Sequence, residues 1–162
     1  METLIRSTKT EDLSKLFKIF SDVNATGDCY PYSNEVSEEQ FKALWMAPSN
    51  VSYVAEIDGA VAGAYFIKAQ WPDRGSHVAT AHYMVSKDFR RMGVGRLLGE
   101  HSLKTARDGG FLSMQFNLVV STNESAIKLY EKLGFKIIGR LPKTFNHSTL
   151  GLVDTFVMHR FL

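Results

Sequence analysis

Two short segments in the second half of the chain combine residue types that can bind an anionic ligand and act on it. The first runs from Arg90 to Arg96 and the second from Asn123 to Phe135. Each follows a run of apolar residues with strand character and opens a run with helical spacing. A ligand between them would meet the starts of two helices, where main-chain N–H groups lack helical partners.

The first segment has the composition of a phosphate-binding turn. Free N–H groups and the helix dipole favour an anion at a helix start, and glycines let that anion approach the backbone. The segment lacks the third glycine of a dinucleotide-binding fingerprint and the Gly-Lys-Ser/Thr of a P-loop. A helix start softened by glycine, with its arginines in solvent, stays the alternative. The anion site is predicted at Arg90, Arg91, Met92, Gly93, Val94, Gly95 and Arg96.

The second segment presents an amide and a phenol on one helix face. Asn123 and Tyr130 are seven residues apart, or two helical turns, so their side chains project from the same side. Gly134 ends the predicted helix. Asn123 is also suited to capping the helix, and Tyr130 could instead pack as a half-buried aromatic beside Leu129 and Leu133.

Both segments resemble signatures of the GCN5-related N-acetyltransferases, the GNAT superfamily. Arg90 to Gly95 fits the R-x-x-G-x-G turn that binds the pyrophosphate of acetyl-CoA, and Asn123 to Phe135 fits N-x-x-A-x-x-L-Y-x-x-x-G-F. The resemblance implies acetyl-CoA as co-substrate, held in a gap between splayed central strands, and direct attack of an amine on the thioester. Tyr130 would then protonate the leaving sulfur. Besides the turn, the implied cofactor-binding residues are Tyr83, Val85, Asn123, Ala126 and Tyr130.

A narrower likeness is to fungal N-acetyltransferases that detoxify proline analogues. In that group asparagines near the thioester position the acceptor, and Asn117 and Asn123 match two of them. Thr80 stands where a third asparagine is expected, and Tyr130 stands where tryptophan is expected. The likeness implies a small amino acid or related amine as acceptor. It rests on residues 75–78, 93–100, 116–119 and 152–154.

The base that would deprotonate the amine is not evident. Many family members have a glutamate on the fourth strand, where this chain has Ala79. His82 is the candidate on that strand, although strand alternation turns it away from Tyr83 unless a bulge redirects it. His77 is a second candidate, and a base acting through water or binding of the free amine also stays open.

Four aromatic residues of the first half are candidates for walls of the acceptor pocket, with core packing as the equal alternative. Cys29 is not expected to act as a nucleophile, because no His or Asp is identifiably paired with it. His101 is expected to be solvated. The four aromatic candidates are Tyr30, Tyr32, Trp45 and Trp71.

The elements that must position these residues form a mixed α/β (α+β) fold. Periodicity predicts one domain over residues 1–162, with a sheet of about seven strands splayed between the fourth and fifth and helices on both faces. Asp58-Gly59 predicts a two-residue hairpin turn, and Ser37 with Gln40 predicts a capping box. Strands are expected at 2–6, 51–57, 60–69, 77–85, 111–120, 135–138 and 152–161, and helices at 9–20, 37–46, 95–107 and 123–133.

Composition excludes several classes of protein. The chain has 162 residues, 44% of them hydrophobic, enough for one continuous core. The net charge of +2 is too small to indicate a nucleic-acid partner, and no apolar run reaches the ~20 residues of a membrane span. One cysteine excludes a disulfide framework, and no metal site is expected. A cytoplasmic location is the default.

The leading hypothesis is a small-molecule N-acetyltransferase. A GNAT enzyme that acetylates a protein N-terminus or a lysine is the second, and the acidic first half of the chain allows it. A non-catalytic acyl-CoA-binding regulatory domain is the third. A homodimer that uses a terminal strand such as Leu152–Phe161 is possible.

Overall fold

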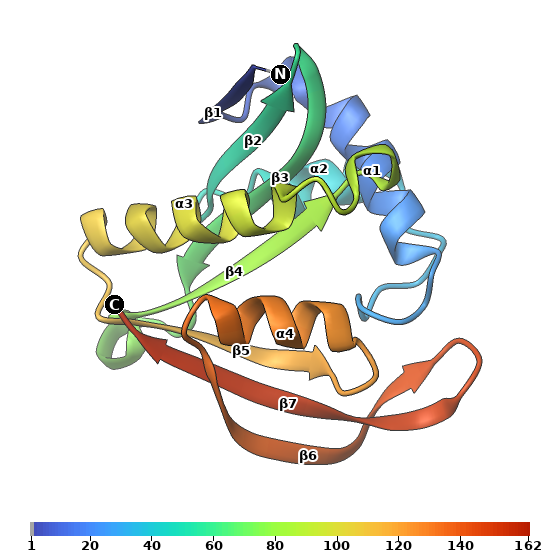
Figure 1. Ribbon diagram of the computed structural model, residues 1–162, viewed down its shortest axis with the longest axis vertical. Helices are drawn as coiled ribbons and strands as arrows, with labels where there is room; N and C mark the ends of the chain where they lie inside the picture. The colour runs from blue at the N-terminus through green and yellow to red at the C-terminus, as the bar shows by residue number, and fades with distance from the viewer. Residues whose placement is uncertain (1) are drawn as a thin grey trace.

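The computed structural model describes residues 2–162 as one twisted sheet with helices on both faces (Figure 1). The strands are β1 (Thr3–Ser7), β2 (Val51–Ile57), β3 (Ala60–Ala69), β4 (Val78–Val85), β5 (Ser113–Val120), β6 (Lys136–His147) and β7 (Gly151–Phe161). The helices are α1 (Leu13–Asn24), α2 (Glu38–Trp45), α3 (Val94–Asp108) and α4 (Glu124–Lys132). The sheet order is β1-β2-β3-β4-β5-β7-β6, and only β4 and β5 run parallel. The predicted mixed α/β fold is confirmed.

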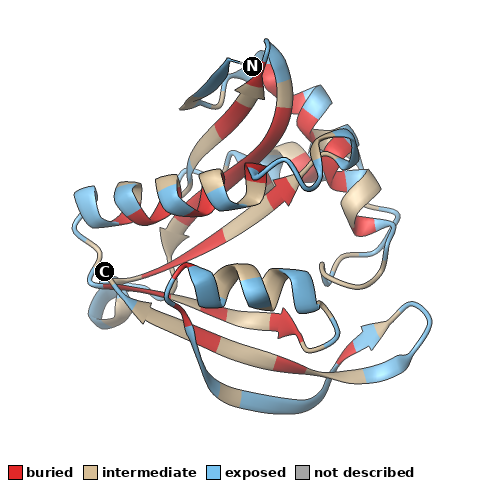
Figure 2. Ribbon diagram, in the orientation of Figure 1, coloured by how far each residue is buried: buried red, intermediate tan, exposed pale blue. Residues whose placement is uncertain are grey.

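Strand alternation divides the core into two layers. On one face, α1 and α2 pack on Val54, Ala64, Phe66 and Met84. On the other face, α3 and α4 pack on a second cluster that includes Tyr65 and the apolar side of β5. Buried residues therefore follow the middle of the sheet, whereas β6 at the edge is largely exposed (Figure 2). No helix among residues 2–162 is long and apolar enough to cross a membrane.

The sheet opens between β4 and β5. The two strands pair only at Val78 with Ser113 and at Ala79 with Met114, after which they diverge. Antiparallel pairing with β3 uses alternate residues of β4, and it continues to Ser86, whose N–H donates to the Ala62 carbonyl at 2.9 Å. The intervening residues thus turn their N–H and C=O groups toward the opening. This is the predicted splay.

Local sequence signals predicted the hairpin turn and the helix cap of the first half of the chain correctly. Asp58 and Gly59 have φ values of 48° and 80°, as the hairpin turn requires. Ser37 and Gln40 form the predicted capping box. The first helix differs, because a 3₁₀ turn at Thr10–Asp12 precedes it and its last turn continues to Asn24.

The last hairpin is longer than predicted. β6 runs to His147 instead of ending near Ile138, with register shifts against β7 between Ile137 and Gly139 and between Leu141 and Phe145. Pro142 lies inside the second irregularity. Proline lacks an N–H but is tolerated at edge strands and bulges. The sequence around Pro142 therefore suggested that the strand had ended, whereas β6 bends there and continues.

A charged cluster ties the first strand to the first helix. The guanidinium of Arg6 donates to both carboxylate oxygens of Asp12 at 2.8 and 2.9 Å and to Glu56 at 2.5 Å. Asp12 is buried, and its carboxylate also accepts the Lys9 main-chain N–H at 2.8 Å. The Arg6 guanidinium is the main reason that the pKa of Asp12 lies below its usual value.

Candidate active site

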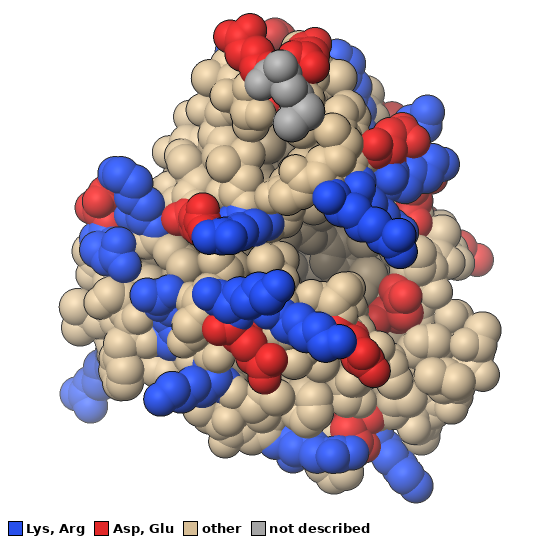
Figure 3. Space-filling view, in the orientation of Figure 1, with Lys and Arg blue, Asp and Glu red and all other residues tan. Residues whose placement is uncertain are grey.

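A cleft of about 950 Å³ occupies the opening between β4 and β5. It is lined by the glycine turn before α3, by one face of α4, by both faces of β4, by residues 116–120 of β5 and by the loop 25–36. Figure 3 views the molecule from the side of α3 and α4 and shows a hollow near its centre, with basic side chains beside it. Every residue predicted to bind the cofactor or to act in catalysis lines the cleft except Met92, whose side chain is exposed.

The glycine turn is built to receive an anion. Arg91 and Gly93 have φ values of 64° and 81°, and Gly93 is the N-cap of α3. The first helical bond is from Leu97 N–H to the Gly93 carbonyl, so the N–H groups of residues 91–96 precede it. Successive N–H groups in such a turn form an anion-binding concavity. Arg90 and Arg91 have no acidic partner within 4 Å among the described residues, whereas Arg96 pairs with Glu100 at 2.7 Å.

Gly95 serves a purpose that the sequence did not show. A Cβ at this position would lie 3.2 Å from the Leu129 side chain of α4. One helical turn later, a Cβ at Gly99 would lie 2.4 Å from Leu133. The small residues let α3 approach α4 closely and thereby set the width of the cleft, whereas Gly93 is the glycine that the turn needs for its positive φ.

The main chain of β4 offers a row of hydrogen-bonding groups to the cleft. Tyr83 and Val85 turn these groups toward β5, which has moved away at this level. The Tyr83 carbonyl accepts a hydrogen bond from the hydroxyl of Tyr30 in the loop 25–36. Tyr30, predicted only as a possible pocket wall, therefore reaches the strand to which the amide groups of a ligand would bind.

Tyr130 lies at the centre of the site. Its ring contacts Phe116, with ring centroids 4.7 Å apart, and lies near Tyr83 and Phe135. Burial, assisted by Cys29, raises the pKa of Tyr130 to about 12. The phenol is therefore protonated at neutral pH and can donate its proton. Both predicted roles, packing and proton donation, are compatible with this position.

The two predicted asparagines line the cleft from different elements. Asn123 caps α4, its Oδ1 accepting the Ala126 N–H at 3.3 Å and the Ser125 hydroxyl at 3.1 Å. Asn117 projects from β5, and its Oδ1 accepts from Gln115 Nε2 at 2.7 Å. In both side chains the amide Nδ2 has no partner among the described residues. Each therefore keeps a donor free for a ligand in the cleft.

His82 reaches the cleft without the bulge that strand alternation led us to expect. The register of β4 against β3 is continuous, and the ring stacks on Phe66 at 4.6 Å on the α1 and α2 face. The opening passes through the sheet, so residues of both faces of β4 line it. Burial, with a smaller contribution from Lys68, lowers the pKa of His82 to about 4. The imidazole is thus neutral at pH 7 and able to accept a proton, though as a weak base.

Of the other candidates, Trp45 follows the core-packing alternative, and the predictions for Trp71 and His101 were wrong. Trp45 is in the core, where its indole N–H donates to Ser52 at 2.7 Å, and Trp71 is exposed on a turn away from the cleft. His101 is not merely solvated, since its Nδ1 hydrogen-bonds with the Tyr65 hydroxyl at 2.7 Å. The sequence could not separate these cases, because aromatic type and period are the same in a core as in a pocket.

Cys29 lines the cleft but is not activated. Burial is the main cause that raises the pKa of its thiol to about 11, and Asp28 adds to it. The thiolate, which would be the nucleophile, is therefore a negligible species at neutral pH. Among the described residues no group of three or more His, Cys, Asp or Glu side chains is arranged to hold a metal ion.

A clasp between distant segments lies next to Thr26, which lines the cleft. Ser148, in the β6–β7 turn, donates its N–H to the Gly27 carbonyl and its hydroxyl to the Thr26 carbonyl, both at 2.9 Å. Gly27 has a φ of 63°, and a Cβ there would lie 2.5 Å from the Cβ of Ser148. The clasp thus joins the loop 25–36 to the long hairpin. The sequence signal for it is Gly27 alone, which does not reveal its partner.

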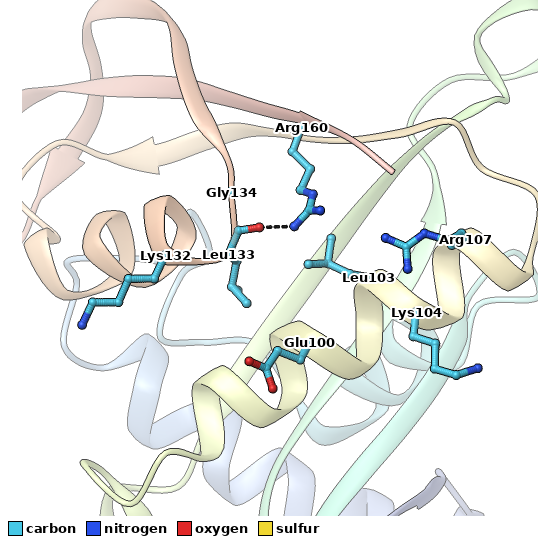
Figure 4. A pocket seen from close by; sticks show the side chains of 8 residues that line it. All are labelled: Glu100, Leu103, Lys104, Arg107, Lys132, Leu133, Gly134 and Arg160. Atoms are coloured by element: carbon cyan, nitrogen blue, oxygen red, sulfur yellow. Dashed lines mark hydrogen bonds between the residues drawn. The ribbon is translucent and has the colours of Figure 1, made fainter.

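A second hollow, of about 340 Å³, lies between the C-terminal parts of α3 and α4 (Figure 4). Arg160 of β7 extends into it and donates to the Leu133 carbonyl at the end of α4. A basic side chain at a helix C-terminus satisfies a free carbonyl and opposes the helix dipole. None of the predicted site residues lines this hollow. We assign it to helix capping.

Comparison with known proteins gives the same family as the residues. The sequence model of the acetyltransferase (GNAT) family matches residues 14–135, three quarters of the chain. The chain belongs to this family. The match ends at Phe135, so it includes both signature segments and leaves out the last hairpin. The predicted GNAT membership is confirmed.

Individual relatives agree with this assignment. The chain is 32% identical over 135 residues to N-acetyltransferase aca1 of Schizosaccharomyces pombe, covering 83% of this chain and 58% of that protein. It is 27% identical to an N-alpha-acetyltransferase of Sulfurisphaera tokodaii, covering 97% and 92%. A GCN5-related N-acetyltransferase from Kribbella flavida has the same fold, with a TM-score of 0.94, 38% identity and coverage of 99% and 98%. The chain spans just over half the length of the Schizosaccharomyces pombe relative.

Proposed function

We propose that this chain transfers the acetyl group of acetyl-CoA to the amine of a small molecule, an amino acid or related amine. The observation that carries the proposal is the continuity of the cleft. It runs from the free N–H groups of residues 91–96, along the open edge of β4, to the phenol of Tyr130. An anionic end, an arm with amide groups and a reactive thioester would meet matching groups in that order.

Each part of the cleft has a distinct task in this proposal. The turn and its arginines hold the pyrophosphate, and the β4 main chain at Tyr83 and Val85 holds the amide-bearing arm together with the free Nδ2 of Asn123. Acetyl-CoA supplies an activated thioester, so no acyl-enzyme is needed and Cys29 can remain a thiol. The amine nitrogen bonds to the acetyl carbonyl carbon, and the bond from that carbon to the CoA sulfur breaks. Tyr130 donates its proton to the departing sulfur.

The acceptor side lies on the α1 and α2 face. Asn117 and His82 face it from the two separated strands, and Asn117 offers an amide donor to the acceptor or to the acetyl carbonyl. His82 accepts a proton from the attacking amine directly or through water. Because its pKa is near 4, we expect the enzyme to act mainly on amine that binds already deprotonated, with activity rising as pH rises toward the amine pKa.

The second candidate is acetylation of a protein N-terminus. The Sulfurisphaera tokodaii relative, named an N-alpha-acetyltransferase and matched over nearly its whole length, favours it. The clasp between Gly27 and Ser148 favours the small acceptor instead, because it ties down the loop 25–36, which lines the cleft.

Release of free CoA distinguishes these activities. Acetyl-CoA is incubated with the protein and, separately, with the twenty amino acids, with small amines lacking a carboxylate, and with tetrapeptides of varied first residue. CoA and acetylated products are quantified by chromatography and mass spectrometry. We expect amine-dependent CoA release with small acceptors only. Release with peptides alone would establish the second candidate, and acetyl-CoA binding without any release would leave a non-catalytic binding domain.

A further inference from the structure

A polar patch interrupts the apolar face of the sheet where α1 and α2 no longer cover it. Lys68 lies opposite Thr80 in the pairing of β3 with β4, and Phe66 lies opposite His82. Side chains two residues apart on a strand share a face, so Lys68, Thr80 and His82 project to the α1 and α2 side, and Gln70 follows β3 directly. All four line the cleft. Nothing in the proposed handling of acetyl-CoA uses Lys68 or Gln70.

Lys68 brings a positive charge to this patch without a protein counter-charge. The side chain is half-buried, and no carboxylate of the described residues lies within 4 Å of its ammonium. Asp28 is the acidic residue among those that line the cleft, and its Oδ1 accepts a hydrogen bond from the Thr26 hydroxyl. A partly desolvated ammonium gains most from an anion that comes with the ligand.

The pyrophosphate of acetyl-CoA is not that anion. The glycine turn follows the end of β4 at Val85, whereas Lys68 is paired with Thr80, five residues earlier. At about 3.3 Å per residue the two levels are about 17 Å apart along the strand. They also lie on opposite faces, since the turn leads into α3 and the patch faces α1 and α2. An anion bound at Lys68 would therefore come from a ligand other than the pyrophosphate, and the acceptor is the other ligand of this cleft in the proposed reaction.

The spacing within the patch fits an amine that carries its own carboxylate. Lys68 pairs with Thr80 of the neighbouring strand, and His82 lies two residues beyond Thr80 on the same face. The lysine charge is near enough to lower the pKa of His82. A carboxylate bound to the ammonium of Lys68 would direct the amine of the same small molecule toward His82 and the opening between the strands. We propose that Lys68 binds the carboxylate of the acceptor, which is therefore an α-amino acid or a similarly compact amino carboxylate.

This inference rests on the proposed acetyl transfer, and its test separates the two. The probes are the L-amino acid that gives the fastest CoA release and its carboxamide, which differs only in lacking the negative charge. The variants are Lys68→Met, which keeps the length of the side chain, and Lys68→Arg, which keeps the charge. Lys136→Met is the matched control, because Lys136 is an exposed strand lysine outside the cleft and without an ion pair in the described chain.

We expect Lys68→Met to raise the KM of the amino acid roughly 10- to 100-fold, the loss of one charge-assisted contact. The KM of the carboxamide should already be high and should not change, and the KM of acetyl-CoA should stay constant. Lys68→Arg should recover much of the amino-acid affinity, and Lys136→Met should behave as wild type. Equal effects of Lys68→Met on acid and amide, or no effect on either, would overturn the assignment.

Binding decides the case in which no acceptor is turned over. The twenty amino acids are titrated by calorimetry into the protein saturated with CoA. Binding that Lys68→Met abolishes and Lys136→Met preserves would support the carboxylate site while the proposed activity fails. Absence of binding by every amino acid, or binding that is insensitive to Lys68→Met, would overturn the site itself.

Discussion

Tyr130 retains its phenolic proton across the working range of pH, because burial raises its pKa to about 12. A proton held at the centre of the cleft can be given to a departing thiolate. An alkyl thiol has a pKa of about 8.5, so its thiolate leaves tolerably well without help. The expected contribution of the phenol is therefore at the low end of general acid catalysis.

The first prediction concerns this hydroxyl. Tyr130→Phe should lower kcat roughly 10- to 100-fold with little change in acetyl-CoA affinity, since the ring and its contacts with Phe116 remain. Steady-state kinetics across pH and calorimetry with acetyl-CoA measure the two quantities. A variant with the wild-type kcat at every pH, with chemistry rate-limiting, would show that the residue only packs.

At the scale of elements, the proposed anion site lies at the start of α3, and its two glycines differ in purpose. Gly93 holds a positive φ at the N-cap, whereas Gly95 makes room for Leu129 of α4. The contribution of Gly93 to binding can be separated from its contribution to folding. Gly110, beyond the end of the same helix, has nearly the same φ of 84°, and a Cβ there would also meet nothing within 4 Å.

Gly93→Ala and Gly110→Ala should each cost about 1 kcal/mol of unfolding free energy, because both place a Cβ on a left-handed backbone. Only Gly93→Ala should weaken acetyl-CoA binding, by roughly 10-fold, as the N–H groups of the turn shift from the pyrophosphate. Urea unfolding and calorimetry give the two values. Equal acetyl-CoA affinity in both variants would remove the turn from the binding site.

For the whole molecule, the Arg6 and Asp12 pair links folding to pH. The Arg6 guanidinium lowers the pKa of Asp12 in the folded state, so the unfolded state binds a proton more readily. The contribution of the pair is complete above the unfolded pKa of about 3.9 and is lost as pH falls through the lower folded value.

Asp12→Asn should reduce the unfolding free energy at pH 7 by about 3 kcal/mol, since it leaves a half-buried guanidinium with one carboxylate instead of two. Its deficit should shrink as pH falls below about 4, where wild type loses the same interaction. Asp108→Asn, which breaks an exposed pair with Lys104, should have a far smaller effect. Urea denaturation at several pH values provides the measurement, and a deficit independent of pH would contradict this origin.

The sequence by itself determined the family, the order of elements and the residues of the two signatures, because these depend on neighbours along the chain. A positive φ at Gly93, a cap at Asn123 and the seven-residue spacing to Tyr130 are local properties that residue types reveal directly. The hairpin turn at Asp58-Gly59 belongs to the same group. Such features need no knowledge of what packs above or below them.

Only the tertiary structure decided which polar and aromatic residues meet at the cleft. Trp45 and Tyr30 are both aromatic residues that could line a pocket or pack in the core, yet one is in the core and the other binds the Tyr83 carbonyl. The place of Lys68 beside His82 follows only from its pairing with Thr80, and the role of Ser148 follows only from its contact with Gly27, 121 residues away. The physical reason is that the opening between β4 and β5 passes through the sheet. Strand alternation predicts which face a side chain takes but not that both faces border one cavity.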